Sequence, residues 1–522
     1  MKKIKLYDYQ QEMLENIIKK LTTKSFTPFR KRKDYVENYS VLVQMPTGTG
    51  KTYVMASVVK WFLDSHEKGE VWIVAHRREL VEQMQQTLDR FCLEYGEKEM
   101  VMAAKVRIRV LSIQWLSRHI GELEQAGCFP GLIVVDEAHH ALARSYQDLF
   151  QRNRMALKLG MTATPCRMKK ESFGKLFENL LTSPPTQDFI QRGYLAPYDY
   201  VVIGQFSQDQ LTINGLKGRG SDGDYSVKEM DEKLNVPQSV KRLYESVEKY
   251  AHGKKGIVFA IDIDHAQVIA AYYEAMGIKT VALDSKTPAK TRKQMVEAFR
   301  NGELDCLVNV NLFDEGFDCP DVEYIQMARP TLSLAKYLQM VGRGLRINRQ
   351  KKDKVCMIID NVGNYRKFGL PDSERKWEGM YAGLRAGKGT IPTYAKKANG
   401  VFVATNDMVF VAQYDKQKQE LTRKQRYEYL QNVKPFEASG RWGLRVGDDI
   451  ILQPMYRKIH DFVGGFAIFE IAPNRMGILI RNGKVYCPAD YRDIKILPKN
   501  RALLTKSVIK TVEVQLDTKW GY

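Results

Sequence analysis

Residues 41–52 read Val-Leu-Val-Gln-Met-Pro-Thr-Gly-Thr-Gly-Lys-Thr, an apolar run of strand length that leads into a glycine-rich loop. Apolar residues at helical spacing follow between Val54 and Phe62. Strand, glycine-rich loop and helix in this order form a P-loop, whose main-chain N–H groups surround phosphates because glycine has no Cβ. The lysine is expected to reach the β and γ phosphates, and the hydroxyl after it to bind Mg²⁺. The predicted nucleotide-binding residues are Thr47, Gly48, Thr49, Gly50, Lys51 and Thr52.

A second apolar run ends in two acidic residues. Residues 132–135, Leu-Ile-Val-Val, have the continuous apolar character of a parallel strand that is buried on both faces. Asp136-Glu137-Ala138-His139 follows directly. We expect Asp136 to hold Mg²⁺ through water and Glu137 to position or deprotonate an attacking water. The predicted cofactors are therefore ATP and Mg²⁺.

The P-loop together with Asp136–His139 resembles the motor core of superfamily 2 helicases of the DEAD/DEAH-box type. The resemblance implies further motifs in a fixed order, and the first lobe contains matching segments. Residues 6–11 match the segment whose glutamine reads adenine, with Gln10 at that position. Residues 71–80, with Arg77 and Arg78, and residues 110–114 match segments that touch the nucleic-acid backbone. Residues 160–165, Gly-Met-Thr-Ala-Thr-Pro, match the motif that couples the two lobes.

Two more motifs lie further along the chain. Residues 314–318, Asp-Glu-Gly-Phe-Asp, match the fifth motif, which implies that Gly316 and Asp318 approach the nucleotide from the second lobe. Residues 339–346 match the sixth motif, Q-x-x-G-R-x-x-R, which implies that Arg343 and Arg346 act as catalytic arginine fingers. Such fingers are worth about 10³ to 10⁵ in rate in related NTPases. The form of the fifth motif and residues 328–331 resemble the branch of restriction-enzyme motors and XPB-type repair helicases, which favours DNA.

Strand-like runs alternate with helical stretches on both sides of a glycine-rich region, which predicts two parallel-sheet layers. The expected fold class is α/β: two tandem RecA-like parallel-sheet lobes plus a small, mainly-β C-terminal module. We predict lobe 1, the ATP-binding domain, at residues 1–203, a connector at 204–237 and lobe 2, the helicase C-terminal domain, at 238–370. A basic, partly helical linker is expected at 371–439 and the β module at 440–522.

The C-terminal part carries weaker patterns. Basic residues crowd between Lys416 and Arg426, and again between Arg30 and Lys33; each group is either a nucleic-acid contact or a solvated surface. In the β module, a pattern around Trp442 recurs at Met476, 34 residues later. This resembles a pair of degenerate WG-type repeats. We interpret the module as a candidate contact site for another protein.

Composition restricts the class of partner. The chain of 522 residues has 81 Lys and Arg against 61 Asp and Glu, a formal net charge of +20. This excess indicates a polyanionic partner, with nucleic acid the first candidate, or serves solubility alone. We see no signal peptide and no apolar run of the roughly 20 residues that a membrane span needs. Seven scattered cysteines argue against a disulfide framework and fit a reducing, cytoplasmic compartment.

The predicted function is an ATP-dependent nucleic-acid motor, a helicase or translocase acting on DNA, with catalytic residues Glu137, Lys51, Arg343 and Arg346. Two alternatives stay open. One is a nucleotide-switched protein that binds or remodels duplex without separating strands, and the other is an RNA helicase.

Overall fold

The computed structural model describes two compact units, Met1–Tyr414 and Asp415–Tyr522. The described residues are 5–22, 40–96, 106–168, 171–284, 286–310, 321–348, 351, 353–384, 408–414, 428–483, 485–498, 501–507 and 510–515. The predictions for Gly316, Asp318 and the two basic runs at 30–33 and 416–426 lie outside them. None of the helices in these ranges combines the length and apolar character needed to cross a membrane.

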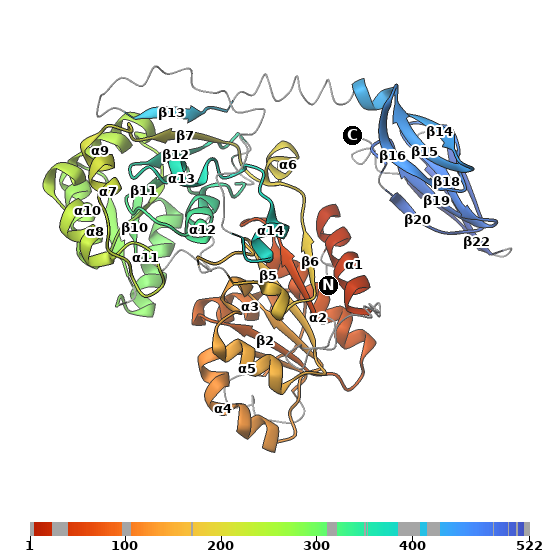
Figure 1. Cartoon of the computed structure of the whole chain (residues 1–522), viewed down its shortest axis with the longest axis horizontal. Coiled ribbons are helices and arrows are strands. Elements are labelled where there is room, and N and C mark those ends of the chain that lie inside the picture. The colour runs from red at the N-terminus through yellow and green to blue at the C-terminus, as the bar shows by residue number, and fades with distance from the viewer. Residues whose placement is uncertain are drawn as a thin grey trace. The chain divides into compact units, whose positions relative to one another are not determined.

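The first lobe is built on six parallel strands (Figure 1). Alternate side chains of β1 enter different cores: Val41 and Val43 join one, and Leu42 joins the other. Both faces are therefore buried, which explains the continuous apolar runs of the sequence. In spatial order the strands are β3 (Ile108–Ser112), β2 (Val71–Ala75), β4 (Leu132–Val135), β5 (Leu157–Thr162), β1 (Ser40–Gln44) and β6 (Asn179–Thr182).

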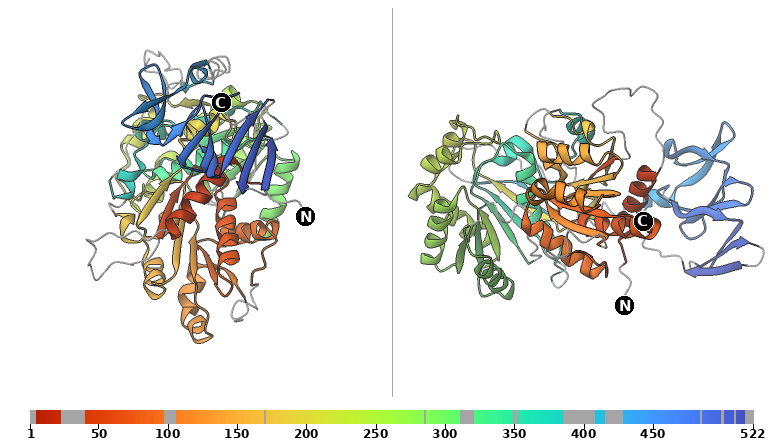
Figure 2. Two further views of the ribbon diagram at one scale, coloured as in Figure 1. Left: turned by 90° about the vertical axis from the view of Figure 1, so that its right-hand side faces the viewer. Right: turned by 90° about the horizontal axis from the view of Figure 1, so that it is seen from below.

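Helices cover both faces of this sheet (Figures 1 and 2). The core that contains Val41 also takes in residues of α1 (Asp8–Thr22), α2 (Lys51–Ser65) and α3 (Arg78–Arg90). The core that contains Leu42 takes in residues of α4 (Ile113–Gln125) and α5 (Arg144–Arg152). Three short helices complete the lobe and the crossing that leaves it: η1 (Ala138–His140), η2 (Phe173–Lys175) and α6 (Thr186–Gln191).

The second lobe contains a sheet of seven described strands, parallel except for β13. Their order is β13 (Val409–Ala412), β7 (Tyr198–Val202), β12 (Cys356–Asp360), β11 (Tyr324–Met327), β8 (Gly256–Phe259), β10 (Cys306–Asn309) and β9 (Thr280–Leu283). On one face pack α9 (Pro237–Ala251) and α10 (Ile263–Ala275); residues of α11 (Ala289–Asn301) and α12 (Leu334–Gly344) join the core on the other. The predicted fold class, two parallel-sheet lobes with a β module, is confirmed.

Two features of the region between the lobes differ from expectation. Strand β7 pairs with β12 of the second sheet, although residues up to 203 were assigned to the first lobe. The predicted connector contains α7 (Gln208–Asn214) and α8 (Val227–Leu234). Each helix has a serine cap, and the Ser226 hydroxyl accepts a hydrogen bond from the Glu229 main-chain N–H at 3.4 Å. The Ser-x-x-Glu sequence has the signature of a capping box, a readable helix signal, although the Glu229 carboxylate accepts from the main-chain N–H groups of Lys217 and Gly218 and not from that of Ser226.

After α13 (Asn364–Phe368) the chain returns to the first lobe. Residues 371–384, which we call the strap, include α14 (Trp377–Tyr381). The Tyr381 hydroxyl donates to the main-chain oxygen of Phe177, and the Ser172 hydroxyl donates to that of Tyr381 at 3.3 Å. The strap is therefore a second crossing between the lobes, beside residues 183–197, rather than a free linker.

The second unit is antiparallel throughout its described strands. Its sheets are β14 (Lys434–Ala438), β15 (Arg441–Val446) and β16 (Asp449–Tyr456); β17 (Lys458–Ile459), β18 (Phe466–Ala472), β19 (Arg475–Ile480) and β20 (Val485–Tyr491); and β21 (Asp493–Leu497), β22 (Arg501–Ser507) and β23 (Lys510–Gln515). Gly443 and Gly477, 34 residues apart, lie beside matching irregularities in pairing. The two sheets thus share a local structure; their assignment as WG repeats stays a prediction.

We predict that Gly477→Ala and Gly443→Ala each destabilise this unit by about 2 kcal/mol, the usual range for overpacking. A Cβ on Gly477 would lie 2.5 Å from the Cys487 carbonyl oxygen, and one on Gly443 would lie 2.4 Å from that of Leu452. Native-state hydrogen exchange of peptides from residues 434–491 measures the change. Gly121→Ala, with open space around the new Cβ, is the control and should leave this exchange unaltered. Unchanged exchange in both module variants would contradict the close approach.

Candidate nucleotide site at the interface of the two lobes

The parallel sheet of the first lobe places the predicted motifs at one edge. β5 lies between β4 and β1, so the acidic pair after β4 and the P-loop after β1 flank the end of β5. The carboxyl ends of parallel strands share an edge, and ligands of open α/β sheets bind there. Thr162, at the end of β5, thus stands between the two motifs.

The P-loop has the backbone that its glycines allow. Gly48 and Gly50 have φ of 87° and 79°, in the left-handed region that favours glycine. Gly50 directly precedes α2 and has no side chain to cap it, so the first main-chain N–H groups of the helix remain available to an anion. The Thr49 hydroxyl donates to the Pro46 carbonyl at 2.8 Å and closes the turn.

Gln10 is held against this loop. Its side-chain amide donates to the Thr49 carbonyl at 3.1 Å, and the Tyr9 hydroxyl donates to the same oxygen at 2.9 Å. The side-chain Oε1 of Gln10 accepts a hydrogen bond from the main-chain N–H of Tyr7 at 2.9 Å. The structure therefore brings Gln10 to the P-loop, and its contact with adenine stays a prediction.

An aromatic neighbour of Gln10 was missed by the sequence analysis. The ring of Tyr194 lies 5.0 Å from that of Tyr7 and 4.8 Å from that of Tyr9, and its hydroxyl donates to Asp8 at 2.8 Å. Tyr194 comes from the crossing between the lobes, far from Gln10 in the sequence. No local pattern marks it, because its role depends on where the crossing packs.

Charged groups of both lobes converge on Lys51. Its ammonium donates to the Met45 carbonyl at 3.4 Å. Burial lowers the pKa of Lys51, the carboxylates of Glu137 and Asp136 oppose that shift, and the guanidinium groups of Arg343 and Arg346 add to it. The charges of the predicted acids and arginines therefore act on the predicted lysine, although the five residues come from three separate stretches of sequence.

The acidic pair is tied to the segment after β5. The Asp136 carboxylate accepts from the Glu137 N–H at 2.8 Å, and Glu137 itself has a φ of 45°, which is strained for a residue other than glycine. Its Oε2 lies 3.2 Å from Nδ1 of His139, which is also 3.2 Å from the Thr162 hydroxyl. That hydroxyl accepts from the Thr164 N–H at 3.1 Å. A polar chain thus joins the acid to the predicted coupling motif.

The predicted Mg²⁺ ligands fit the ion's chemistry. Thr52 is in the first turn of α2, and Asp136 is a buried carboxylate close to Lys51. Within the described residues, no group of three or more His, Cys, Asp or Glu is arranged to hold a metal. Mg²⁺ in nucleotide sites uses one or two carboxylates and fills its shell with phosphates and water, so a hydroxyl and one carboxylate suffice.

Helix α12 brings the second lobe against the P-loop. A Cβ built on Gly342 would lie 2.7 Å from Cβ of Thr47, and one on Gly48 would lie 3.4 Å from Cγ of Arg346. Arg343, the next residue after Gly342, is only 4% exposed. The predicted arginine fingers are therefore on or next to the helix that faces the P-loop. Gly316 and Asp318 lie outside the described residues.

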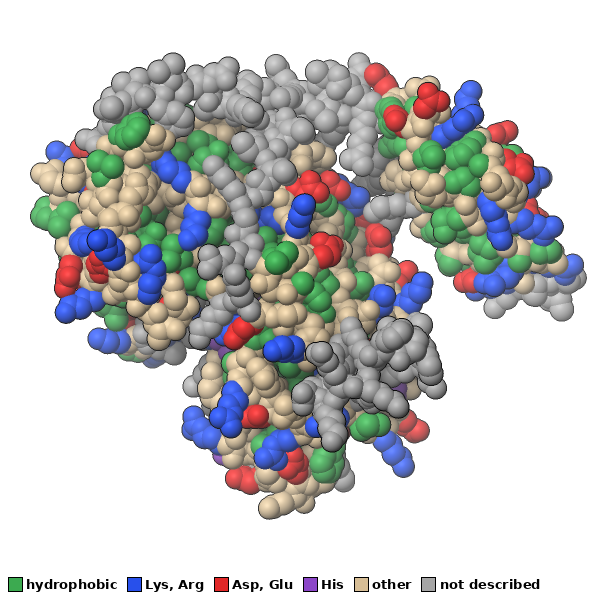
Figure 3. Space-filling model, in the orientation of Figure 1, with side chains coloured by type: hydrophobic (Ala, Val, Ile, Leu, Met, Phe, Trp, Pro, Cys, Tyr) green, Lys and Arg blue, Asp and Glu red, His purple; other side chains and the backbone are tan. Residues whose placement is uncertain are grey.

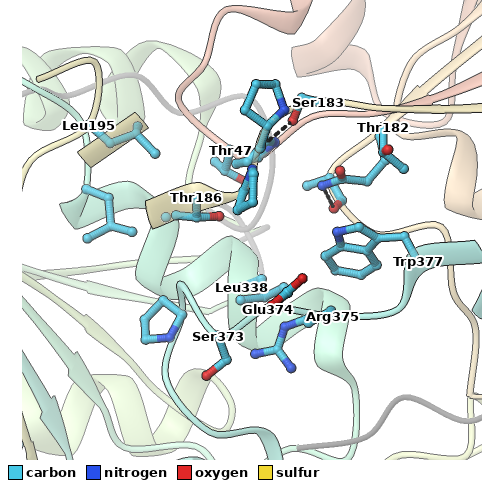
Figure 4. Close-up of a pocket in the computed structure, with 18 of the residues that line it drawn as sticks. Thr47, Thr182, Ser183, Thr186, Leu195, Leu338, Ser373, Glu374, Arg375 and Trp377 are labelled. Atoms are coloured by element: carbon cyan, nitrogen blue, oxygen red, sulfur yellow. Dashed lines mark hydrogen bonds between the residues drawn. The ribbon is translucent and has the colours of Figure 1, made fainter. Parts of the chain in front are cut away.

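The interface also contains a cavity of about 330 Å³. Figure 4 shows Ser373, Glu374, Arg375 and Trp377 of the strap across from Thr47, Thr182 and Ser183 of the first lobe. Arg375 is buried and donates to the main-chain oxygens of Phe368 and Leu370 at 2.9 and 3.0 Å. These strap residues were missed, because residues 371–439 read only as a polar linker.

The segments expected to touch nucleic acid lie at the same edge of the sheet. Arg77 precedes α3, and the side-chain amide of Gln114, in α4, donates to the His76 carbonyl at 2.9 Å. Lys and Arg side chains are interspersed with acidic ones over both lobes on the face drawn in Figure 3.

The strap provides a pH-dependent prediction. Burial raises the pKa of Asp372 to about 7. A hydrogen bond from the Tyr198 hydroxyl and the charge of Arg375 both act to lower this pKa, but burial outweighs them. The folded protein binds this proton more tightly than the unfolded chain does. The contribution of Asp372 to the free energy of unfolding is therefore largest below its ordinary pKa near 4 and is lost as pH rises through 7. Asp372→Asn keeps the acceptor and does not titrate. We expect the thermal midpoint to fall between pH 6 and pH 8 more for the native chain than for this variant; parallel curves would contradict it.

Comparison with known proteins agrees with this arrangement. Residues 3–167 match the family "Type III restriction enzyme, res subunit", and residues 238–348 match "Helicase conserved C-terminal domain". A "51.5 kDa protein" of a Lactococcus phage is 31% identical over 342 residues, which are 66% of this chain and 70% of the phage protein.

Two further relatives carry functional names. "Putative ATP-dependent helicase IRC3" of Saccharomyces cerevisiae is 26% identical over 62% of this chain and 48% of its own length. "DNA 3'-5' translocase XPB2" of Sulfurisphaera tokodaii is 24% identical over 69% of this chain and 82% of its own length. The chain thus spans about half of the yeast relative and more of the other two.

Among solved structures, a fragment of a putative HsdR subunit of a type I restriction enzyme from Vibrio vulnificus has the same fold. Its TM-score is 0.51 at 22% identity, over 70% of this chain and 65% of the fragment. Together with the two matched families, these relatives show that the chain belongs to the superfamily 2 helicases of the restriction-enzyme and XPB type.

Proposed function

We propose that the protein is an ATP-dependent motor that acts on DNA and hydrolyses ATP with Mg²⁺ between its two lobes. The observation that carries this proposal is the contact of α12 with the P-loop, which brings Arg343 and Arg346 close enough for their charges to act on Lys51, as those of Asp136 and Glu137 do. Family membership supports the same activity.

Each group has a role that its chemistry suits. The N–H groups at the start of α2 and Lys51 bind the phosphates, and Gln10 would contact the adenine beside the loop. Thr52 and Asp136 would hold Mg²⁺, which supplies charge neutralisation to the phosphates when bound. Glu137 orients the attacking water and accepts its proton. Arg343 and Arg346 stabilise the charge that develops on the transferred phosphate.

Two arguments favour DNA as the polymer. Relatives whose names refer to DNA or to restriction enzymes match along more than half of this chain. The net charge of +20 is the sign that a polyanion requires. Contact with a protein partner through the β module stays a prediction.

The mode of action has two versions. In the first, lobe movements separate strands; in the second, the protein translocates on or clamps duplex without separating it. The motor residues are shared by both, so a strand-displacement assay with a tailed duplex is needed to choose.

The first prediction from this function concerns the polymer. Duplex DNA should raise ATP turnover, and added salt should erode the effect, because phosphate contacts release counterions. Turnover is measured without polymer and with single-stranded DNA, duplex DNA and RNA over a salt series. Glu137→Gln and Lys51→Ala should lose turnover under every condition. Equal turnover with and without every polymer would contradict a nucleic-acid motor, and stimulation by RNA alone would select the RNA-helicase alternative.

The second prediction tests the contact between the lobes. Gly342→Ala places a methyl group 2.7 Å from Cβ of Thr47, so either α12 or the P-loop must shift. Misplacing a catalytic group by about 1 Å can cost on the order of 10²-fold, so turnover should fall at least about tenfold. Gly121→Ala makes the same chemical change in a helix where nothing lies within 4 Å of the new Cβ, and this variant should retain native turnover. Native turnover in Gly342→Ala would refute the role assigned to this contact.

A further inference from the structure

Three histidine rings contact one another in series, each tilted against the next, at the edge of the first sheet. The ring centroids of His139 and His140 are 4.2 Å apart, and those of His140 and His76 are 3.9 Å apart. The interplanar angles are 40° and 39°. We call His76, His140 and His139 the histidine stack; its central member, His140, contacts both others.

The topology of the sheet creates this stack. β2 and β4 are parallel neighbours, with Val74 opposite Val135, and the Asp136 N–H donates to the Val74 carbonyl at 3.2 Å. The chain beyond β2 therefore begins beside the acidic pair. The short helix η1 then turns His140 back over the end of β2, where His76 lies.

One end of the stack reaches the group proposed to activate water. Nδ1 of His139 lies 3.2 Å from Oε2 of Glu137. His139 is 8% exposed and also contacts the Thr162 hydroxyl, so it has little freedom to move independently of its neighbours. Because the Glu137 backbone has a strained φ of 45°, its carboxylate direction depends on such surrounding contacts.

The other end reaches both segments expected to touch nucleic acid. His76 directly precedes Arg77, the candidate phosphate contact, and its carbonyl accepts the hydrogen bond from Gln114. A displacement of either segment therefore moves the His76 backbone. Of the three residues, His139 is buried while His76 and His140 are partly exposed. A shift of the His76 ring therefore reaches His139 through its contact with the His140 ring at 3.9 Å.

We propose that the histidine stack transmits nucleic-acid contact at residues 76–77 and 114 to the Glu137 carboxylate, with His140 as the positioning residue at its centre. The inference rests on the proposed function, since it concerns how a polymer raises ATP turnover. His140 touches neither reacting atoms nor polymer in this account; it acts through His139. The required property is the aromatic ring in contact on both sides.

The test compares stimulation, the ratio of ATP turnover with a duplex to turnover without it, across matched variants. His140→Ala should lower stimulation about tenfold, the size expected when a catalytic group is misplaced by less than 1 Å. The Kd for the same duplex, measured by fluorescence anisotropy, should change less than about twofold, because the phosphate contacts remain. His140→Phe keeps a ring in the stack and should retain most of the stimulation.

Two further variants separate coupling from folding. His76→Ala should lower stimulation as His140→Ala does, and the double variant should be no worse than either, because contacts in one path are not additive. His119→Ala is the control: its ring stacks on Trp115 at 4.3 Å in the same lobe, and its loss should leave stimulation intact. If His140→Ala lowers the thermal midpoint, its loss of stimulation is not used. The stimulation of His140→Phe, expected to be retained, is then compared with that of His76→Ala, expected to be lost.

The outcomes are distinguishable. A wild type that no polymer stimulates refutes the proposed function itself. A stimulated wild type with equally stimulated His140→Ala overturns the stack as a transmitter. Loss of stimulation in His140→Phe as complete as in the alanine variant also overturns it, since the ring contact would then not be what couples. Effects of His76→Ala and His140→Ala that multiply would show two independent residues and overturn it as well.

Discussion

The contact between Gly342 of α12 and Thr47 of the P-loop is the constraint on which the site depends. A nucleotide loop on a sheet edge supplies phosphate-binding N–H groups and a lysine, but it has no cation on the opposite side. That cation must come from another element, and only a residue without a side chain lets α12 approach closely enough. The absence of one carbon atom thus permits Arg343 and Arg346 to stand near Lys51. Under the proposed function, neither lobe alone holds all the groups that the reaction needs.

The parts that could be read from the sequence are those that a short stretch determines by itself. Buried parallel strands have continuous apolar sequences, which made β1 and β4 predictable. A P-loop needs its glycines at fixed positions, which made the loop predictable. The placement of Gln10 followed from motif order. The position of β7 did not, because an apolar run of five residues fits either sheet and only its pairing with β12 decides. Tyr194 and Trp377 are likewise defined by packing between distant segments.

Two segments of the chain cross between the lobes, and no sequence motif indicates either crossing. Residues 183–197 lead from β6 to β7, and the strap returns to the first lobe through Tyr381. The cavity between them is lined by both lobes and by the strap. Any opening of the lobes therefore changes the strap's contacts or carries the strap along. Domain motions in such molecules are hinge movements of a few connecting residues, and these crossings are where that movement must be absorbed.

Electrostatics gives this movement a direction. Burial is the main cause of the lowered pKa of Lys51, and the guanidinium groups of Arg343 and Arg346 lower it further. The carboxylates of Glu137 and Asp136 act on Lys51 more strongly than the two arginines do, so charges of both signs already act at this site. A polyphosphate between Lys51 and the two arginines would add attraction to cations on both sides of the site, and the effect is large where the groups are shielded from water. Under the proposed function, bound ATP therefore stabilises contact between the lobes, and departure of the phosphates removes the charge that held α12 against the P-loop. In this proposal the cycle is driven by a change in the number of negative charges between Lys51 on one side and Arg343 and Arg346 on the other.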